Sequence, residues 1–345
     1  MFHSLYQDFQ NPTLARDLKG LLLLKLALGA SVYLFLIISG LEYPFNFHDF
    51  ADVYRTCSSI NINIGFTQFV CIVNVQSITQ PIPILFSFML MFVSFMLIYS
   101  AFFNYLSRKG QLFLMVLLLI HPYLLISTFR LTTDLFAMLA VSITVYFIVR
   151  NLEFKLSFYL LILILILFRY HLAAIFLPLF CMTLYENLRY KNRIDYLSLI
   201  SLLLLLIGLS LSVSYALMFT GSNSGFHPVS LMFNIIYLLG FREMVAIDGI
   251  AAFLCCNLAW HNLQFAISIG LIILHAIGLA GIWKVSKDIN NKVLIILLYL
   301  IPCILVIGHL RFLLALMPVL MAGTAYLFLN NKTITSLTDS NDRHI

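Results

Sequence analysis

The stretch "LSFYLLILILILFRYHLAAIFLPLF", residues 156–180, decides the fold because it places two basic side chains inside an apolar run. Arg169 and His171 follow a segment that is nearly all Leu, Ile and Phe. From Lys155 to Arg169 is roughly 21 Å of helix at about 1.5 Å per residue, whereas the hydrocarbon layer of a bilayer is about 30 Å thick. We therefore expect a short helix, a break near Tyr170 and a return helix, with both basic groups below one membrane surface.

A single helix over residues 156–187 is the alternative. It would carry Arg189, Lys191 and Arg193 to the opposite side of the membrane or upset every later span. A non-helical backbone is tolerated at this depth only where it lines protein or a wet cavity. Because a charge at the bilayer centre costs roughly 2.5–3.5 kcal/mol on insertion scales, Arg169 needs a partner or a function.

The composition extends the membrane interpretation to the whole chain. Of the 345 residues 62% are hydrophobic and 10% charged, with a mean hydropathy of +1.01, whereas soluble domains average roughly 25% charged residues. We expect an all-α, polytopic transmembrane bundle forming a single integral membrane domain over residues 1–345. The polar N-terminal segment is expected to precede a retained anchor helix rather than to begin a cleaved signal peptide. The expected spans are residues 19–40, 80–105, 110–128, 131–149, 156–169, 171–187, 195–217, 263–283, 292–309 and 312–330.

The distribution of basic residues predicts the orientation. With both termini in the cytoplasm, 15 of the 20 basic residues, including every lysine and thus Lys25, fall on the cytoplasmic side, as the positive-inside rule requires. Five arginines stay outside against that bias: Arg55, Arg130, Arg169, Arg242 and Arg311. The outer side also receives most histidines, among them His121, His171 and His309.

The first outer loop, expected over about 41–79, contains a compact acidic group. Asp49 and Asp52 are three residues apart, followed by Tyr54, so one helical turn would place both carboxylates on one face. They could act as a base or as metal ligands, or they could position an arginine. A solvated loop with ordinary charges is the alternative.

Arg130 is expected to open the next helix from outside, with Asp134 pairing with it across one turn. Such an arginine could donate its planar fork to phosphate oxygens while the aspartate orients it. A purely structural intramembrane ion pair is the alternative.

Three further groups lie on the expected outer side. Arg169 and His171 lie at the same break between two helices. A single buried histidine is usually an ordinary core residue, but two basic groups at one break favour a functional role. His309 and Arg311 precede the last helix and could instead be an interfacial pair. Arg242 lies in the second outer loop, about 218–262, which reads as a lid or a plain amphipathic cover.

Several pattern classes are missing from the sequence. It has no phosphate-binding glycine motif and no Cys/His metal spacing, so neither a cofactor nor a metal is expected. The net charge of +6 reports membrane orientation rather than nucleic-acid binding.

Four segments in this order resemble the EpsG family, the Wzy-like polymerases of bacterial O-antigen and exopolysaccharide. They are "HDFADVY" with "IGFTQFVCIV", "STFRLTTDLFAMLAVSITVYFIVRN", "FRYHLAAIFLPLF" and "HLRFLLALMPVL". The resemblance covers about residues 20–330. Leu131 stands where that family usually has Gln, Asp134 where it has Ala, and Arg169 has no counterpart in the family pattern.

The resemblance implies a GT-C-like fold in the bacterial inner membrane with its active site facing the periplasm. The activity it implies is transfer of a glycan from undecaprenyl diphosphate to a sugar hydroxyl of another lipid-linked repeat unit. The expected partners are these lipid-linked oligosaccharides, the lipid bilayer and a chain-length regulator protein.

The ionisable residues fit this chemistry. Preorganised cations stabilise a leaving diphosphate, which assigns Arg130, Arg169, Arg311 and His309 to substrate binding. A neutral histidine can take the acceptor's proton, so His171 is the first candidate base and Asp49 or Asp52 the second. Asp134, Tyr54 and Arg242 are expected to support them.

Other functions stay open at this point. A glucosyltransferase that modifies O-antigen with undecaprenyl phosphate-glucose would share the fold and the acidic first loop. A flippase or transporter of lipid-linked sugars would also need a cationic cavity, although no repeated halves are visible. A membrane O-acyltransferase is disfavoured by the expected outer placement of the histidines.

Overall fold

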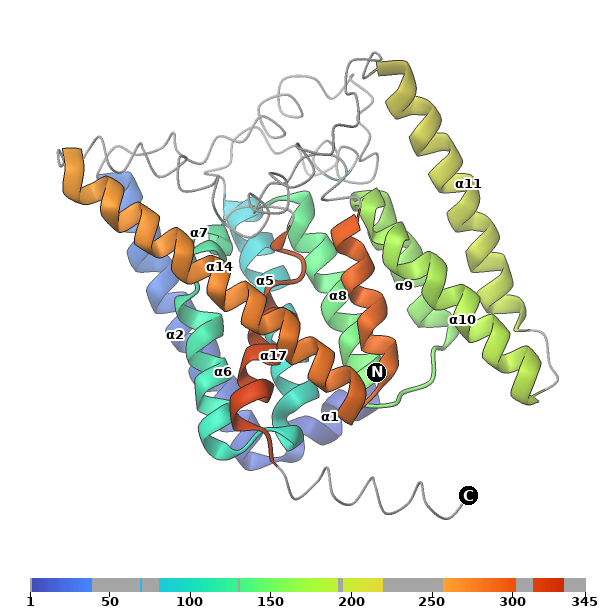
Figure 1. The fold of residues 1–345 in the computed structure, drawn as a ribbon, viewed down its shortest axis with the longest axis horizontal. Helices are drawn as coiled ribbons and strands as arrows, with labels where there is room; N and C mark the ends of the chain where they lie inside the picture. The colour runs from blue at the N-terminus through green and yellow to red at the C-terminus, as the bar shows by residue number, and fades with distance from the viewer. Residues whose placement is uncertain are drawn as a thin grey trace.

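The computed structural model describes residues 2–38, 69, 81–129, 131–191, 195–219, 257–301 and 313–331. This part of the chain is a bundle of helices (Figure 1). The α-helices are α1 (Phe2–Gln10), α2 (Pro12–Ile38), α5 (Pro81–Phe102), α6 (Arg108–Ile120), α7 (Pro122–Ile126), α8 (Thr133–Val149), α9 (Leu156–Phe168), α10 (Ala173–Lys191), α11 (Tyr196–Phe219), α14 (Asn257–Asp288) and α17 (Met317–Leu329). The 3₁₀ helices are η1 (Phe103–Tyr105), η2 (Ser127–Phe129), η3 (Tyr170–Leu172) and η5 (Asn291–Tyr299).

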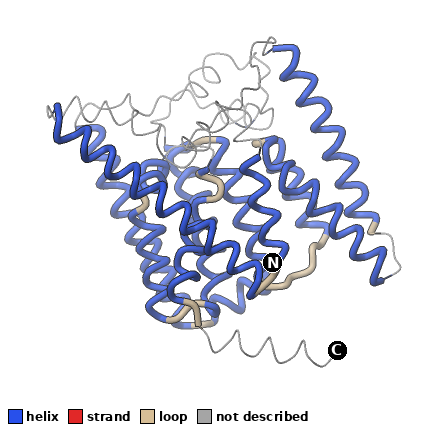
Figure 2. Tube along the Cα trace, viewed as in Figure 1, coloured by secondary structure: helices blue, strands red, loops and turns tan. Residues whose placement is uncertain are grey.

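The expected all-α class is confirmed for the described residues. They contain no β-strand (Figure 2), and their single β-bridge joins Leu106 to Asn330. Two helical segments are long and apolar enough to cross a membrane, Ile82–Tyr105 and Ile269–Asp288, which is weak evidence for membrane association.

The predicted break near Tyr170 is confirmed. Helix α9 ends at Phe168, Arg169 is extended (φ −151°, ψ 96°), and the chain passes through η3 into α10. The rings of Tyr159 on α9 and Phe180 on α10 lie 5.1 Å apart. The two helices therefore form the short hairpin that the position of Arg169 and His171 predicted.

Three predicted spans are wrong in detail. Residues 110–128 do not form one helix, because His121 leaves the helical region before Pro122 (φ −55°, ψ 120°), as proline disfavours the α conformation in the residue ahead of it. Helix α14 begins at Asn257, inside the predicted outer loop 218–262, and the start of the 292–309 span is a 3₁₀ helix rather than an α-helix.

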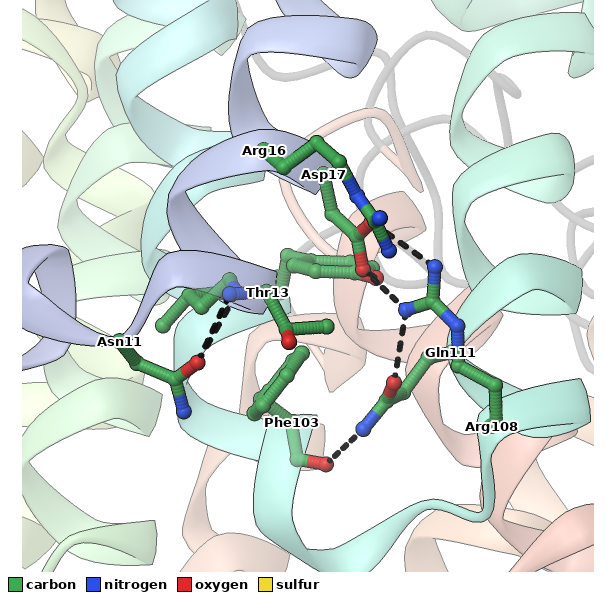
Figure 3. A network of polar contacts seen from close by, with 9 residues as sticks. Asn11, Thr13, Arg16, Asp17, Phe103, Arg108 and Gln111 are labelled. Carbon is green, nitrogen blue, oxygen red and sulfur yellow. Dashed lines mark hydrogen bonds and ion pairs between the residues drawn. The ribbon is translucent and has the colours of Figure 1, made fainter.

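Polar contacts join the helix ends at one end of the bundle, which we call the basal end; α2 and α6 begin there and α14 and α17 finish there. Arg108 at the start of α6 forms an ion pair with Asp17 on α2 and hydrogen-bonds Gln111, which in turn donates to the carbonyl of Phe103 (Figure 3). Tyr99 also donates to Asp17, at 2.9 Å. Burial alone would raise the pKa of Asp17, but the hydrogen bonds from Arg108 and Tyr99 outweigh it, so this pKa lies below its ordinary value of 3.8.

Glycines let α14 and α17 approach closely. A Cβ at Gly281 would lie 2.0 Å from the carbonyl oxygen of Gly323, and a Cβ at Gly323 would lie 2.6 Å from that of Gly278. Small residues at such a contact are typical of packed membrane helices. The pair forms one wall of the bundle core (Figure 1).

Candidate functional site

The α9–α10 break delivers Arg169 and His171 to the opposite end of the bundle, which we call the apical end; α5 and α8 begin there and α9 finishes there (Figure 1). Because Arg169 is extended, its side chain leaves the line of α9 and turns into the protein. Arg169 and His171 are 3% and 4% exposed. Both lie roughly 21 Å of helix from Lys155 at the basal start of α9.

The guanidinium of Arg169 is held by two consecutive residues in the first turn of α8. Its Nη2 lies 3.2 Å from Oδ1 of Asp134, and its Nη1 donates to Oγ1 of Thr133 at 3.1 Å. Asp134 is 1% exposed. A carboxylate in the first turn of a helix also benefits from the positive end of the helix dipole. The fork of Arg169 is therefore fixed in one orientation inside the protein.

The predicted pairing of Asp134 with Arg130 involves a residue outside the described part of the chain. Helix α8 begins only at Thr133, and Thr132 is extended (φ −134°, ψ 159°). Among the described residues, Asp134 pairs with Arg169, a residue 35 positions later that the sequence analysis placed separately.

His171 lies between α10 and η5. Its ring centroid is 6.4 Å from that of Tyr299, which is fully buried at the end of η5. Sequence reasoning missed both Tyr299 and Thr133. Thr133 stands next to Asp134, but only the fold brings its hydroxyl to Arg169. Tyr299 belongs to the expected ninth span, and that span is the one signal that could have placed it near the site.

An aromatic cluster packs beside the ion pair. Phe168, next to Arg169, stacks on Phe136 of α8 with 4.2 Å between centroids. Phe69 contacts both rings, at 6.0 and 5.9 Å. Phe69 belongs to the motif "IGFTQFVCIV" of the predicted first outer loop, so this one residue of the motif lies in the ion-pair region.

The other predicted site residues lie outside the described residues: Asp49, Asp52, Tyr54, Arg130, Arg242, His309 and Arg311. The site that the structure does describe consists of Arg169, Asp134, Thr133, His171 and Tyr299.

The chain matches no family model, no curated protein and no solved structure at a significant level. Among the residues that the structure describes, no group of three or more His, Cys, Asp or Glu residues could hold a metal ion.

Two polar cavities lie at the basal end, away from this site. One of about 540 Å³ is lined by residues of the α5–α6 turn together with Arg150. The other, of about 320 Å³, contains the Lys292–Glu186 ion pair (2.6 Å) and Asp195. Asp195 there caps α11 by accepting from the backbone of Ser198 and from its hydroxyl. Their polar groups bind one another and tie loops together.

A second buried group of ionisable side chains was not anticipated. Lys25 of α2, His121 of the α6–α7 junction and His275 of α14 are 0%, 2% and 0% exposed. The sequence analysis assigned Lys25 to the cytoplasmic side and His121 to the outer side, and it did not predict that both are buried in one region of the bundle. A signal for Lys25 exists in the sequence, where it interrupts the apolar run "LLLLKLALGA".

Proposed function

We propose that this chain is a multi-pass inner-membrane glycosyltransferase that polymerises lipid-linked glycan repeat units at the periplasmic face. The observation that carries the proposal is the buried, oriented Arg169–Asp134–Thr133 group beside His171 at the apical end. The order of the four sequence motifs resembling the EpsG family supports the substrate class, a glycan on undecaprenyl diphosphate.

The surface of the helices supports a lipid environment. On α9 the exposed residues Leu156, Leu160, Ile164 and Leu167 form one face, while Tyr159 and Ile162 are buried on the other. A helix that is apolar on all sides belongs either in a protein core or in a membrane, and the exposed face of α9 excludes the first. The same pattern of exposed Leu, Ile and Phe recurs on α2, α5 and α11.

The buried ion pair supports a role in binding a diphosphate group. Ending α9 at Phe168 and burying the charged Arg169 both cost free energy. Such a buried charge in a membrane protein usually has a functional role. With Asp134 and Thr133 holding two nitrogens of the fork, the guanidinium cannot rotate away when a substrate arrives. A preorganised donor of this kind stabilises developing negative charge without reorganising during the reaction.

His171 supplies the acid–base function in this proposal. The acceptor hydroxyl oxygen attacks the anomeric carbon and forms the new glycosidic bond, while the bond from that carbon to the diphosphate oxygen breaks. The bonding electron pair leaves with undecaprenyl diphosphate, and the hydroxyl proton passes to neutral His171. Arg169, with Arg130 and Arg311 as further predicted cations, meets the charge on the departing diphosphate.

Two alternatives share the same site. An O-antigen-modifying glucosyltransferase would bind the single phosphate of undecaprenyl phosphate-glucose, and a flippase would bind the diphosphate without breaking a bond. Asp134 and Thr133 hold the Arg169 guanidinium in one orientation. A fixed group of this kind favours catalysis over transport, because a transporter must expose its binding site to the two sides of the membrane in turn.

The deciding experiment is a deletion strain examined by lipopolysaccharide gel. Loss of the ladder with a single repeat unit retained supports the polymerase. An intact ladder with altered serology supports the glucosyltransferase, and loss of even the single unit supports the flippase.

Complementation of that strain tests the site itself. Arg169→Ala is expected to give no ladder, whereas Arg189→Ala should restore it fully, because Arg189 is an exposed arginine at the other end of the same hairpin. A full ladder from a normally inserted Arg169→Ala protein would contradict the proposed role.

A further inference from the structure

Lys25, His121 and His275 lie at one level of the bundle. Lys25 is 13 residues after the start of α2, His121 is 13 residues after the start of α6, and His275 is 13 residues before the end of α14. These three helix ends all belong to the basal end (Figure 1), so each residue lies roughly 20 Å from that end, measured along its own helix. Three basic residues from distant parts of the sequence thus converge deep inside the bundle.

The two histidines share a hydrogen bond. Their Nε2 atoms are 3.1 Å apart, with ring centroids at 5.3 Å. A bond between two imidazole nitrogens requires one ring to donate and the other to accept. The pair therefore keeps this bond when neutral and after taking up one proton, and loses it when both rings are fully protonated.

Lys25 is bound to the same junction. Its Nζ donates to the carbonyl of Leu124 at 3.1 Å and lies 5.2 Å from the ring centre of Phe95. The Leu124 carbonyl is accessible because α6 breaks before Pro122, and it also accepts from Thr128 at 2.9 Å. Lys25 thereby holds α7, which begins at Pro122, directly after His121.

The described groups that act on His121 are themselves bases. Among the described residues, the charged or titratable groups that act on His121 are His275 of α14 and Lys25 of α2, and the neighbour from α5 is Phe95. A proton held by any one of the three groups therefore disfavours a second proton on the others. Ionisable side chains in such a position mark proton pathways or binding sites in membrane proteins.

We propose that His121, His275 and Lys25 form a single proton-binding site in the middle of the bundle, which joins α14 to the α6–α7 junction through the shared Nε2–Nε2 bond. The site takes up one proton without losing this bond and opens when a second proton arrives. It is independent of the reaction catalysed at the apical end.

Nitrogen NMR of the full chain, labelled with ¹⁵N-histidine in lipid nanodiscs, tests the site directly. We expect a scalar coupling between two Nε2 nuclei, which disappears in His121→Phe and in His275→Phe and also at acid pH. If a phenylalanine variant fails to fold, His121→Gln and His275→Gln serve the same assignment. Two rings without coupling, or titrating independently of one another, would overturn the shared bond.

Lysine variants test the third member. Lys25→Met should shift the protonation of the histidine pair to higher pH, because a competing cation has been removed. Lys19→Met is the matched control, since Lys19 is exposed on the same helix, and should leave the titration unchanged. Equal titrations in both variants would remove Lys25 from the site. Loss of the coupling on addition of Zn²⁺ at neutral pH, with one ion bound per chain, would show a metal site instead and overturn the proposal.

Discussion

The apical ion pair and the mid-bundle basic site are two ways of keeping ionisable groups inside an apolar protein. At the apical end Arg169 faces Asp134, so opposite charges compensate each other. In the middle Lys25, His121 and His275 are all bases, and they avoid accumulated charge by sharing protons. The first arrangement preserves a fixed cation for a substrate, whereas the second can respond to proton concentration. Replacing single members of each group should therefore have very different consequences.

The largest effect is expected for Arg169→Ala. It removes a preorganised cation, which costs of order 10²-fold or more in rate. It also leaves the buried Asp134 carboxylate without the guanidinium, a change that destabilises by about 3–5 kcal/mol for comparable buried pairs. Polymer length on gels and the thermal unfolding midpoint in detergent measure the two effects.

At the basic site, by contrast, we expect the loss of one charged group to change stability little. Lys25→Met removes a base without leaving a carboxylate behind, so its unfolding midpoint should stay close to that of the wild type. A loss of stability in Lys25→Met as large as that in Arg169→Ala would show that the two groups do not differ in the proposed way.

A substitution on α14 should displace His275 without changing any of the three basic side chains. Gly281→Ala would place a methyl group 2.0 Å from the Gly323 carbonyl, forcing α14 away from α17 at a cost of about 1–3 kcal/mol. Because His275 lies on α14 and Arg169 does not, the ¹⁵N coupling of the histidine pair should weaken more than the proposed polymerase activity.

Gly270→Ala is the matched control for that variant. It lies on the same helix with nothing within 4 Å of the added Cβ, so helix propensity should make it neutral or slightly stabilising. Equal destabilisation by the two alanine variants would contradict the close contact.

Thr133 allows a finer test of the apical group. Thr133→Val keeps the shape of the side chain but removes the oxygen that accepts from Arg169. A hydrogen bond to a charged group contributes about 1.5–3 kcal/mol, so we expect a drop in kcat of about 10-fold or more. Thr133→Ser should recover most of the activity, and a wild-type rate for Thr133→Val would mean that Asp134 alone orients the guanidinium.

The sequence predicted the α9–α10 hairpin because the distance between Lys155 and Arg169 is too short for a full span. The same reasoning did not reveal the contact of Asp134 with Arg169, because the two residues are 35 positions apart and local spacing favoured Arg130. It also did not reveal the contacts of Lys25 and His121. Counting charges at the ends of spans assigns a side to each residue, but a contact between α2, α7 and α14 depends on packing between segments about 100 and 150 residues apart.

Removal of the Asp17–Arg108 ion pair at the basal end is expected to have the smallest effect on stability. Its charges are opposite, as at the apical end, but the Arg108 side chain is 43% exposed, so water and salt weaken the interaction. The pKa of Asp17 lies below 3.8 because hydrogen bonds from Arg108 and Tyr99 outweigh the effect of burial. A lowered pKa in the folded state adds stability above the pKa of the unfolded chain, and this stability is lost as the pH falls through the folded value.

Asp17→Asn should therefore lower the unfolding midpoint slightly at neutral pH and reduce its dependence on pH below about 4. The difference between wild type and variant, measured in detergent over that range, isolates this one carboxylate from the others that titrate there. High salt should narrow the difference at neutral pH, because the guanidinium is accessible to counterions. A difference that grows as the pH falls would contradict this assignment, since protonation of Asp17 removes the charge that the asparagine already lacks.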